Sequence, residues 1–125
     1  MRIEVKNDHP GMKMRFNPID VSIVVDNLVS NARKAKASRV RFELSPVGKR
    51  DLSIRVIDNG NGLTRGVDKN RIFEMGYSTT RGSGLGLYHV RQVLGELGGS
   101  IGLEESTPDK GTAFSIRIAG ASKPK

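Results

Sequence analysis

The sequence contains no cysteine and no tryptophan, and only 5% of its 125 residues are aromatic. The lack of cysteine excludes disulfide scaffolds, zinc–thiolate sites and thiol nucleophiles. The scarcity of aromatic side chains argues against a surface on which single-stranded nucleic acid stacks. No apolar run approaches the roughly 20 residues of a membrane-spanning helix, and no signal peptide opens the chain. These absences predict a soluble domain.

Acidic residues are also scarce relative to basic ones, because 13 Asp and Glu face 21 Lys and Arg, for a net charge of +8. This excess predicts an anionic partner: nucleic acid, an acidic membrane surface, an acidic protein or a phosphorylated small molecule. Composition does not choose among the four. The 15 glycines exceed the average content without a collagen-like period, which predicts special backbone positions in a single folded domain.

Hydrophobic periodicity predicts a mixture of strands and helices. Alternation favours a strand at residues 2–6 and a second short strand at 12–16, and a spacing of three and four favours a five-turn helix from Pro18. The other predicted elements are antiparallel strands at 40–44 and 52–57, a long loop at 59–83, a helix at 85–97, and strands at 100–105 and 112–118. We therefore expect an α/β sandwich whose helices cover one face of a mixed, mostly antiparallel sheet. Residues 1–119 form the domain and residues 120–125 a disordered tail.

Two asparagines occupy the polar edge of the first predicted helix. With Leu28 as the centre of the apolar stripe, Asn31 lies about 60° and Asn27 about 100° away, and Lys34 follows at about 120°. Asparagine is a poor residue for a helix interior, so its repetition one turn apart calls for a reason. Amide oxygens bind hard cations and amide NH₂ groups bind phosphate or water. The alternative is a pair of boundary amides that bind neighbouring backbone.

Two glycine-rich segments flank the long loop. The first, Asp58 to Gly62, follows an apolar strand and reads either as a hairpin turn or as a place where a ligand lies against bare backbone. The segment after it lacks strand character, which argues against the hairpin. The second, Gly82 to Leu87, opens a helix whose N-terminal N–H groups suit a phosphate chain. Its spacing matches neither a dinucleotide-binding fingerprint nor a P-loop.

Together these segments resemble a known superfamily. The stretch Asn27 to Ala32 is similar to the N box of the gyrase, Hsp90, histidine kinase and MutL ATPases, Asp58 to Gly62 to their G1 box, Ile72 to Tyr77 to their F box, and Gly82 to Leu87 to their G2 box. Gly111 and Thr112 resemble the glycine–threonine element before the last strand. The four boxes occur in order, and the match covers about residues 12 to 118. The chain looks most like the catalytic ATP-binding domain of sensor histidine kinases, with the Bergerat-type fold of the superfamily.

The resemblance implies a role for each matching residue. Asn31 corresponds to the Mg²⁺ ligand, Asn27 to the asparagine one turn earlier, and Lys34 to the basic residue that reaches the phosphates. Asp58 corresponds to the aspartate that reads adenine. The other residues implied at the nucleotide are Gly60, Gly62, Gly82, Gly84, Leu85, Gly86, Leu87 and Thr112. The segment between the G1 and G2 boxes would be the ATP lid, with Phe73 and Tyr77 as anchors and Arg81 facing the γ-phosphate.

Position 27 bears on the reaction. The gyrase, Hsp90 and MutL branch has a glutamate there that serves as general base for water, whereas this chain has Asn27, and an amide takes no proton. Asp26 lies about 100° away on the helix and does not replace it. The resemblance therefore implies a kinase that transfers the γ-phosphoryl group of Mg-ATP to a histidine. Neither His9 nor His89 resembles the phosphoacceptor, so the expectation is an acceptor domain outside this chain.

Several functional readings stay open at this stage. The first is the histidine kinase domain, with ATP and Mg²⁺, an acceptor domain and a response regulator as partners, a cytoplasmic location, a monomeric isolated domain and a homodimeric, membrane-anchored parent. The alternatives are an anti-sigma-type serine kinase or stand-alone regulatory ATPase of the same fold, and a nucleotide sensor without catalysis. A nucleic-acid-binding domain is the least favoured, because it requires basic residues such as Arg39, Arg41, Lys49, Arg50 and Arg55 to form one basic face.

Overall fold

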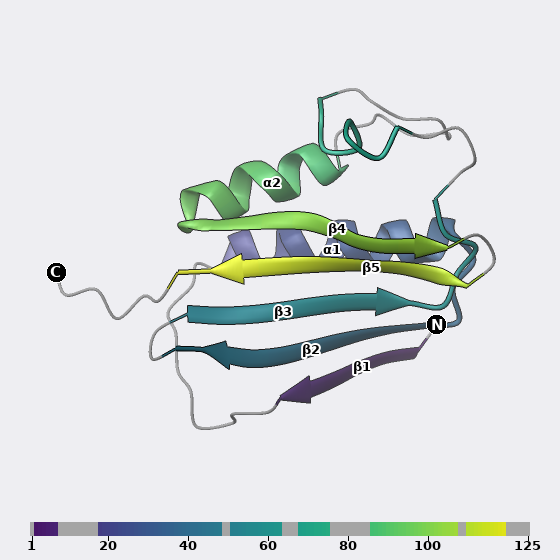
Figure 1. The fold of residues 1–125 in the computed structure, drawn as a ribbon, viewed down its shortest axis with the longest axis horizontal. Helices are drawn as coiled ribbons and strands as arrows, with labels where there is room; N and C mark the ends of the chain where they lie inside the picture. Colours follow the sequence, from purple (N-terminus) through teal and green to yellow (C-terminus); the bar gives the residue numbers. More distant parts are fainter. Residues whose placement is uncertain are drawn as a thin grey trace, which may run out of the picture.

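The computed structural model describes residues 2–7, 18–48, 51–63, 68–75, 86–107 and 110–119. The elements are β1 (Arg2–Asn7), α1 (Pro18–Lys34), β2 (Arg39–Val47), β3 (Asp51–Asp58), α2 (Gly86–Glu96), β4 (Gly99–Thr107) and β5 (Gly111–Ile118). The strands form one sheet in the order β1-β2-β3-β5-β4 (Figure 1). Only β1 and β2 pair in parallel, whereas the other neighbours among these strands are antiparallel. The predicted fold class is confirmed; the strand expected at 12–16 and the tail at 120–125 lie outside the described residues.

The first helix begins and ends where local chemistry favours it. Proline suits the first position of the helix. The charges at its ends complement the helix dipole, with Asp20 in the first turn and Arg33 and Lys34 in the last turn. At the C-terminus Lys36 takes a left-handed conformation with φ 62°. The Lys36 N–H donates to the Arg33 carbonyl at 2.9 Å and the Ala37 N–H to the Ala32 carbonyl at 3.0 Å. These two bonds form a Schellman cap, which fixes how the chain leaves α1 for β2.

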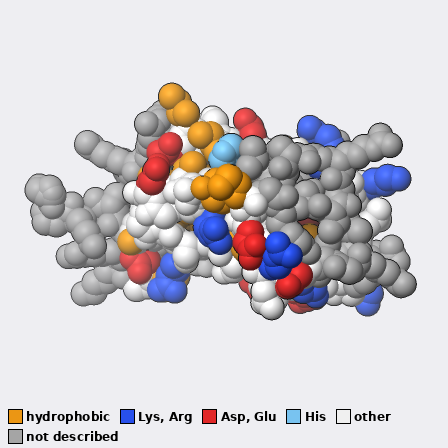
Figure 2. Space-filling model, turned by 90° about the horizontal axis from the view of Figure 1, so that it is seen from above, with side chains coloured by type: hydrophobic (Ala, Val, Ile, Leu, Met, Phe, Trp, Pro, Cys, Tyr) orange, Lys and Arg blue, Asp and Glu red, His pale blue; other side chains and the backbone are white. Residues whose placement is uncertain are grey.

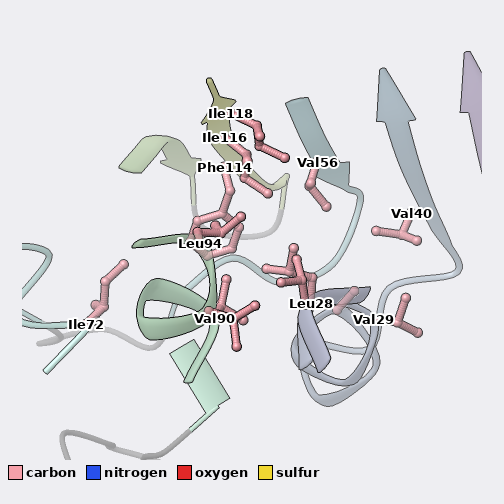
Figure 3. Close-up of a cluster of buried hydrophobic side chains, with 13 residues drawn as sticks. Leu28, Val29, Val40, Val56, Ile72, Val90, Leu94, Phe114, Ile116 and Ile118 are labelled. Atoms are coloured by element: carbon pink, nitrogen blue, oxygen red, sulfur yellow. The ribbon is translucent and has the colours of Figure 1, made fainter. Parts of the chain in front are cut away.

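The hydrophobic core lies between one face of the sheet and both helices. Leu28 and Val29 from α1 and Val90 and Leu94 from α2 are buried against Val40, Val56, Phe114 and Ile116 from the strands (Figure 3). Leucine 94 and Val90 are almost fully inaccessible to solvent, at 1% and 0%. The apolar stripes predicted from the sequence therefore face the sheet, and the helices leave its other face open.

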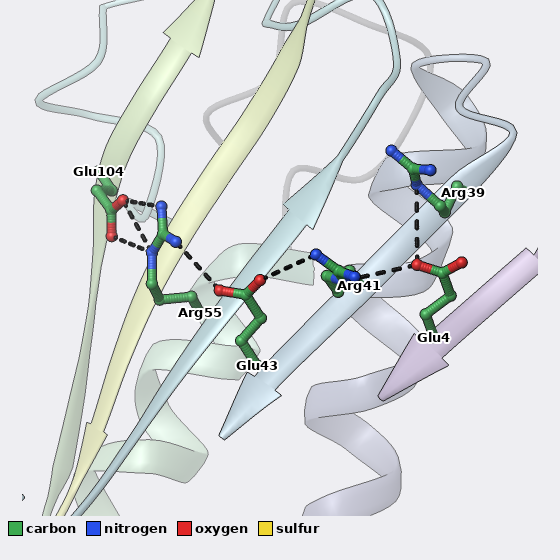
Figure 4. Close-up of polar contacts among 6 residues, drawn as sticks. All are labelled: Glu4, Arg39, Arg41, Glu43, Arg55 and Glu104. Carbon is green, nitrogen blue, oxygen red and sulfur yellow. Dashed lines mark hydrogen bonds and ion pairs between the residues drawn. The ribbon is translucent and has the colours of Figure 1, made fainter. Parts of the chain in front are cut away.

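The open face of the sheet carries a ladder of alternating charges across four strands. Figure 4 shows Arg41 between Glu4 and Glu43, and Arg55 between Glu43 and Glu104. The Arg55 Nη1 to Glu43 Oε1 distance is 3.1 Å, and the Arg55 Nε donates to Glu104 Oε1 at 3.0 Å. The basic side chains of this face are thus interleaved with carboxylates rather than gathered into a basic surface. That arrangement weakens the nucleic-acid reading of the net charge.

The side of the molecule on which α2 lies, at the top of Figure 1, also carries charges of both signs. Figure 2 shows acidic and basic side chains interspersed around hydrophobic ones and a histidine at the surface. Among the described helices, none combines the length and the apolar character needed to cross a membrane.

Candidate functional site

The site is built around Asp58, the last residue of β3. In the registered strand pairs Asp58 lies beside Val40 of β2 and beside Thr112 of β5, and Thr112 lies beside Ser106 of β4. Laterally paired residues project from the same face of a sheet, and Val40 belongs to the core. Three polar side chains, Asp58, Thr112 and Ser106, therefore form a row at one end of the helix-covered face, which we call the polar row.

The carboxyl group of Asp58 is half-buried and held by backbone donors. Burial raises the pKa of this carboxyl above its ordinary value, and backbone hydrogen bonds from Gly60 and Thr112 offset part of the rise. The Gly60 N–H donates to Asp58 Oδ1 at 2.8 Å. A carboxylate fixed in this way can accept a further hydrogen bond from an N–H donor at the end of the sheet.

The turn after Asp58 is fastened to the C-terminus of α1. A Cβ atom on Gly60 would meet the carbonyl oxygen of Ala35 at 2.6 Å, so only glycine fits there. The Asn61 N–H donates to the same carbonyl at 2.8 Å. Asn59 Oδ1 accepts the N–H groups of Ser38 and Arg39 at 3.0 and 2.9 Å. The turn thereby sets the position of Asp58 relative to the helix that carries the two asparagines.

The two helices meet where Asn27 faces Gly86. Asn27 Nδ2 donates to the carbonyl of Ile23 at 2.7 Å, which orients the amide. A Cβ atom on Gly86 would lie 3.0 Å from Asn27 Oδ1. A larger first residue of α2 would crowd the Asn27 amide, and the structure brings the first and last of the four boxes together.

The remaining predicted residues of α1 lie at the border of the core. Asn27 and Asn31 are partly buried, whereas Lys34 is exposed in the last turn. This is the boundary position expected from the helical spacing. The Lys34 side chain is therefore exposed to solvent in the residue before Ala35, which contacts the turn at Gly60.

The F box lies against the core through its aromatic residue. Ile72 is 5% exposed, and the Phe73 ring packs edge-on against Phe114 of β5 with 6.1 Å between ring centroids. The neighbouring Arg71 and Glu74 form an exposed ion pair. Ile72 and Phe73 thus lie against the core next to β5.

The structure describes some of the remaining predicted site residues and leaves others outside the described ranges. Leu87 is partly buried and packs against the core, and Gly62 adopts φ 79° directly after the G1 turn. Tyr77, Arg81, Gly82, Gly84 and Leu85 lie outside the described residues.

Sequence reasoning missed two residues that the structure brings into the site. The sequence predicts Asn59 only as part of the G1 turn, and the partners of its side chain lie 20 and 21 positions earlier. Ser106 carried no motif, yet its Oγ accepts the Leu63 N–H at 2.9 Å and lies 3.1 Å from Thr112 Oγ1. The turn-forming tendency of asparagine is a signal that could have indicated Asn59. For Ser106, strand alternation alone predicts a side chain on the opposite face of the sheet.

The residues present can be tested against a nucleotide and a divalent ion. A Cβ atom at Gly60, Gly62 or Gly86 would come within 3.0 Å of Ala35 O, Thr107 O or Asn27 Oδ1, so these glycines let the segments around Asp58 and Asn27 pack closely. Among the described residues, no cluster of three or more His, Cys, Asp or Glu is placed to hold a metal ion. A divalent ion bound by phosphate oxygens and one amide oxygen is compatible with the residues present.

Comparison with known proteins gives the class. A family model described as "Histidine kinase-, DNA gyrase B-, and HSP90-like ATPase" matches residues 16–121. The chain is similar to the nitrogen regulation protein NtrY of Azorhizobium caulinodans, with 37% identity over 87% of the chain and 15% of that protein. It is also similar to the signal transduction histidine-protein kinase/phosphatase MprB of Mycobacterium ulcerans, with 33% identity over 94% of the chain and 25% of that protein.

Solved structures agree. A mycobacterial sensor histidine kinase MprB superposes with a TM-score of 0.78 at 25% identity, covering 95% of this chain and 81% of that one. Full-length ShkA in complex with AMPPNP superposes with a TM-score of 0.80 at 25% identity, covering 99% of this chain and 27% of that one. The chain therefore belongs to the histidine kinase-, DNA gyrase B- and HSP90-like ATPase family, as a catalytic ATP-binding domain of the sensor histidine kinase type. It spans between 15% and 25% of the length of the two curated relatives described above.

Proposed function

We propose that this domain binds Mg-ATP and transfers the γ-phosphoryl group to a histidine on a dimerisation and phosphoacceptor domain outside this chain, for relay to a response regulator. A ring nitrogen of the acceptor histidine forms the new bond to phosphorus, the bond from phosphorus to the bridging oxygen of ADP breaks, and the histidine N–H proton passes to an acidic residue beside it. The reaction places the domain in the cytoplasm, where ATP and response regulators occur, and a parent dimer supplies the acceptor.

The observation that carries the proposal is that the G1 turn, which follows Asp58, and the first residue of α2 both lie against α1. The G1 turn lies on the end of α1 through Gly60 and Ala35, and α2 begins against Asn27 through Gly86. Both contacts leave little room for a side chain on the glycine, so the G1 turn and the N-terminus of α2 lie close to α1. Adenine's exocyclic amine suits the carboxylate, and phosphates suit helix N–H groups.

The helix residues favour a kinase over a hydrolase. Asn27 offers an amide, and its NH₂ already donates to the Ile23 carbonyl, so it supplies no base for water. Asn31 would hold the Mg²⁺ ion through its amide oxygen, and Lys34 and Arg81 would face the phosphates. Magnesium supplies charge neutralisation at the phosphates when it is bound. Phosphoryl transfer depends mainly on positioning and electrostatics, which these residues supply.

Nucleotide titration and phosphotransfer test the proposal together. Calorimetry should show Mg-dependent ADP binding by the wild-type chain, and Asn31→Ala should lower the rate of transfer from labelled ATP more than it lowers ADP affinity. Ser22→Ala, at an exposed position of the same helix, is the matched control and should change neither quantity.

The chemistry of the label separates the alternatives. With a separately supplied phosphoacceptor domain, label on histidine is lost in acid, whereas label on serine survives it. Acid-stable label would replace the proposal with a serine kinase, and the relatives do not favour that reading. Absence of any Mg-ADP binding would overturn the nucleotide site itself.

A further inference from the structure

β1 forms one edge of the sheet, and within the described part of the chain no strand pairs with its outer side (Figure 1). The Arg2 N–H donates to the Ser38 carbonyl, just before β2, at 2.9 Å. Because the backbone groups of successive residues point to opposite sides of a strand, the N–H and C=O groups of Ile3 and Val5 point away from β2. The outer edge therefore offers donors and acceptors to a further strand.

The apolar side chains of β1 are also left uncovered. Ile3 and Val5 lie beside Val40 and Phe42 of β2, on the face of the sheet that the helices cover. Val40 is 1% exposed, whereas Ile3 is 52% and Val5 67% exposed. The helices thus cover β2 but not β1. An edge that combines unpaired backbone with exposed apolar side chains is a place where another strand adds to a sheet.

The charges of β1 are complementary to those of a second β1 that runs antiparallel to it. With Val5 opposite its own counterpart, Glu4 of each copy lies opposite Lys6 of the other, and Ile3 lies opposite Asn7. A register with Val5 opposite Ile3 places Glu4 against Glu4, and one with Val5 opposite Asn7 places Lys6 against Lys6. Opposite charges across a strand pair stabilise it and like charges destabilise it. Of these registers, only the one centred on Val5 brings opposite charges together.

Lys6 has its charge available for such a pair. Among the described residues it takes part in no ion pair. Glu4 is 31% exposed in its side chain and faces the arginines of its own copy from one side only, at 3.1 Å from Arg2 and 3.5 Å from Arg41. An ammonium group from a second copy therefore finds a carboxylate at the edge.

The opposite edge of the sheet, β4, lacks these properties. Its register shifts between Leu103 and Glu105, and this bulge interrupts the edge. Two consecutive carboxylates, Glu104 and Glu105, are exposed there. Bulges and like charges are common means by which sheet edges resist pairing. Among the described strands, β1 is therefore the edge suited to pair with another copy.

We infer that β1 is a dimerisation edge whose partner is β1 of a second copy of this chain, antiparallel and with Val5 on the two-fold axis. The Val5 residues exchange two backbone hydrogen bonds, and two Glu4–Lys6 ion pairs flank them. The two five-stranded sheets become one continuous sheet through an interface that uses the same surface of both copies. β2 separates β1 from the strands of the polar row, so the interface leaves the candidate nucleotide site open. This pairing replaces the monomer expected from the sequence.

Single cysteine variants test the axis directly, because the chain contains no cysteine of its own. The Cα atoms of a hydrogen-bonded antiparallel pair lie about 5.5 Å apart, within the range that a disulfide spans. With diamide as the oxidant, Val5→Cys should form a disulfide-linked dimer. Ile3→Cys is the matched control on the same face, and in this register its two copies lie about 13 Å apart and should stay unlinked. Equal linking of both variants, or none in Val5→Cys, would overturn the inference.

Charge variants test the register without a covalent bond. Sedimentation equilibrium should show a concentration-dependent dimer of the wild-type chain, and Lys6→Glu should weaken it by about tenfold or more. Glu4→Lys should do the same, and an equimolar mixture of the two variants should dimerise again, because each carboxylate then meets an ammonium group. Lys110→Glu, the same change at an exposed position outside β1, should leave the dimer unchanged.

The outcomes that contradict the inference are distinct. A wild-type chain that stays monomeric at about 1 mM would exclude pairing of any useful strength. A Lys6→Glu dimer as tight as that of the wild type would exclude this register. If thermal melting shows that Glu4→Lys does not fold, the comparison of Lys6→Glu with Lys110→Glu decides alone.

Discussion

At the scale of single residues, the buried charge of Asp58 lowers the stability of the fold at neutral pH, while the same carboxylate is the proposed acceptor for adenine. Its carboxyl is half-buried, and its pKa is raised because burial disfavours the charged form. A raised pKa in the folded state means that this state binds protons more tightly than the unfolded chain. Stability contributed by Asp58 is therefore present below its ordinary pKa and is lost as the pH rises through the raised value.

Asp58→Asn should separate the two effects. The amide oxygen can still accept the backbone N–H groups without the cost of burying a charge, so the melting temperature at pH 7 should rise. Adenine binding should be lost, because the amide NH₂ faces the amine of the base. Melting curves between pH 3 and pH 8 (about the range over which carboxyl groups titrate) should show the gain shrinking toward acid. A variant that is less stable than the wild type at pH 7 would contradict this account.

At the scale of elements, the connection between α1 and β2 is tied to the end of β3. Asn59 accepts two backbone N–H groups through Oδ1, and its Nδ2 donates to Ser38 Oγ at 2.9 Å. The same connection contains the Schellman cap at Ala35, Lys36 and Ala37, which reverses the direction of the chain after α1. The helix with Asn31 and the strand with Asp58 are therefore held in register by side-chain and backbone bonds at one turn.

Variants of this turn have a predicted order of stability. Asn59→Ala removes both accepted bonds and should lower the free energy of unfolding by about 1–2 kcal/mol. Asn59→Asp keeps the acceptor and should lose less, and Ser38→Ala, which removes only the bond to Nδ2, is the matched control. Urea denaturation measures all three. Equal losses in Asn59→Ala and Ser38→Ala would show that the accepted bonds contribute nothing.

The sequence predicted the elements better than their connections. Helix and strand periods identified both helices and the five described strands, because each period is written in neighbouring residues. The partners of Asn59 lie 20 and 21 residues away, and no local pattern indicates them. Ser106 was missed because strand alternation from Ile101 and Leu103 continues to Glu105, and only the bulge shifts the inward position to Ser106. The Asn27–Gly86 approach depends on helix packing, although both residues had been singled out.

At the scale of the whole molecule, the excess positive charge is partly neutralised in pairs. Arg39, Arg41 and Arg55 lie on one face of the sheet. Glu4, Glu43 and Glu104 lie between them and form ion pairs with them. The acidic partners come from strands far apart in the chain, so composition could not reveal the balance. Hydrogen bonds from Arg55 lower the pKa of Glu104, and the stability this gives is lost as the pH falls through the lowered value.

Removal of the central arginine of this ladder should have a small, salt-dependent effect. Because Arg55 is 44% exposed, Arg55→Gln should lower the free energy of unfolding by at most about 1 kcal/mol at low salt. The loss should shrink in about 1 M NaCl, where screening is strong. Arg117→Gln, which removes a single ion pair to Asp51 on the same face, is the control and should lose less. A loss that is unchanged by salt would mean that Arg55 acts through packing.

The pairing of β1 at the edge of the sheet has a consequence for local opening of the sheet. β1 has no buried residue; Ile3 is 52% and Val5 67% exposed, and its ladder to β2 joins segments separated by the whole of α1. Peeling this strand away exposes almost none of the core, so its amide hydrogens should exchange with solvent through local opening, orders of magnitude faster than those of β3 and β5. The edge of the sheet thus behaves as a separate, weakly coupled unit beside a rigid antiparallel centre that holds the polar row.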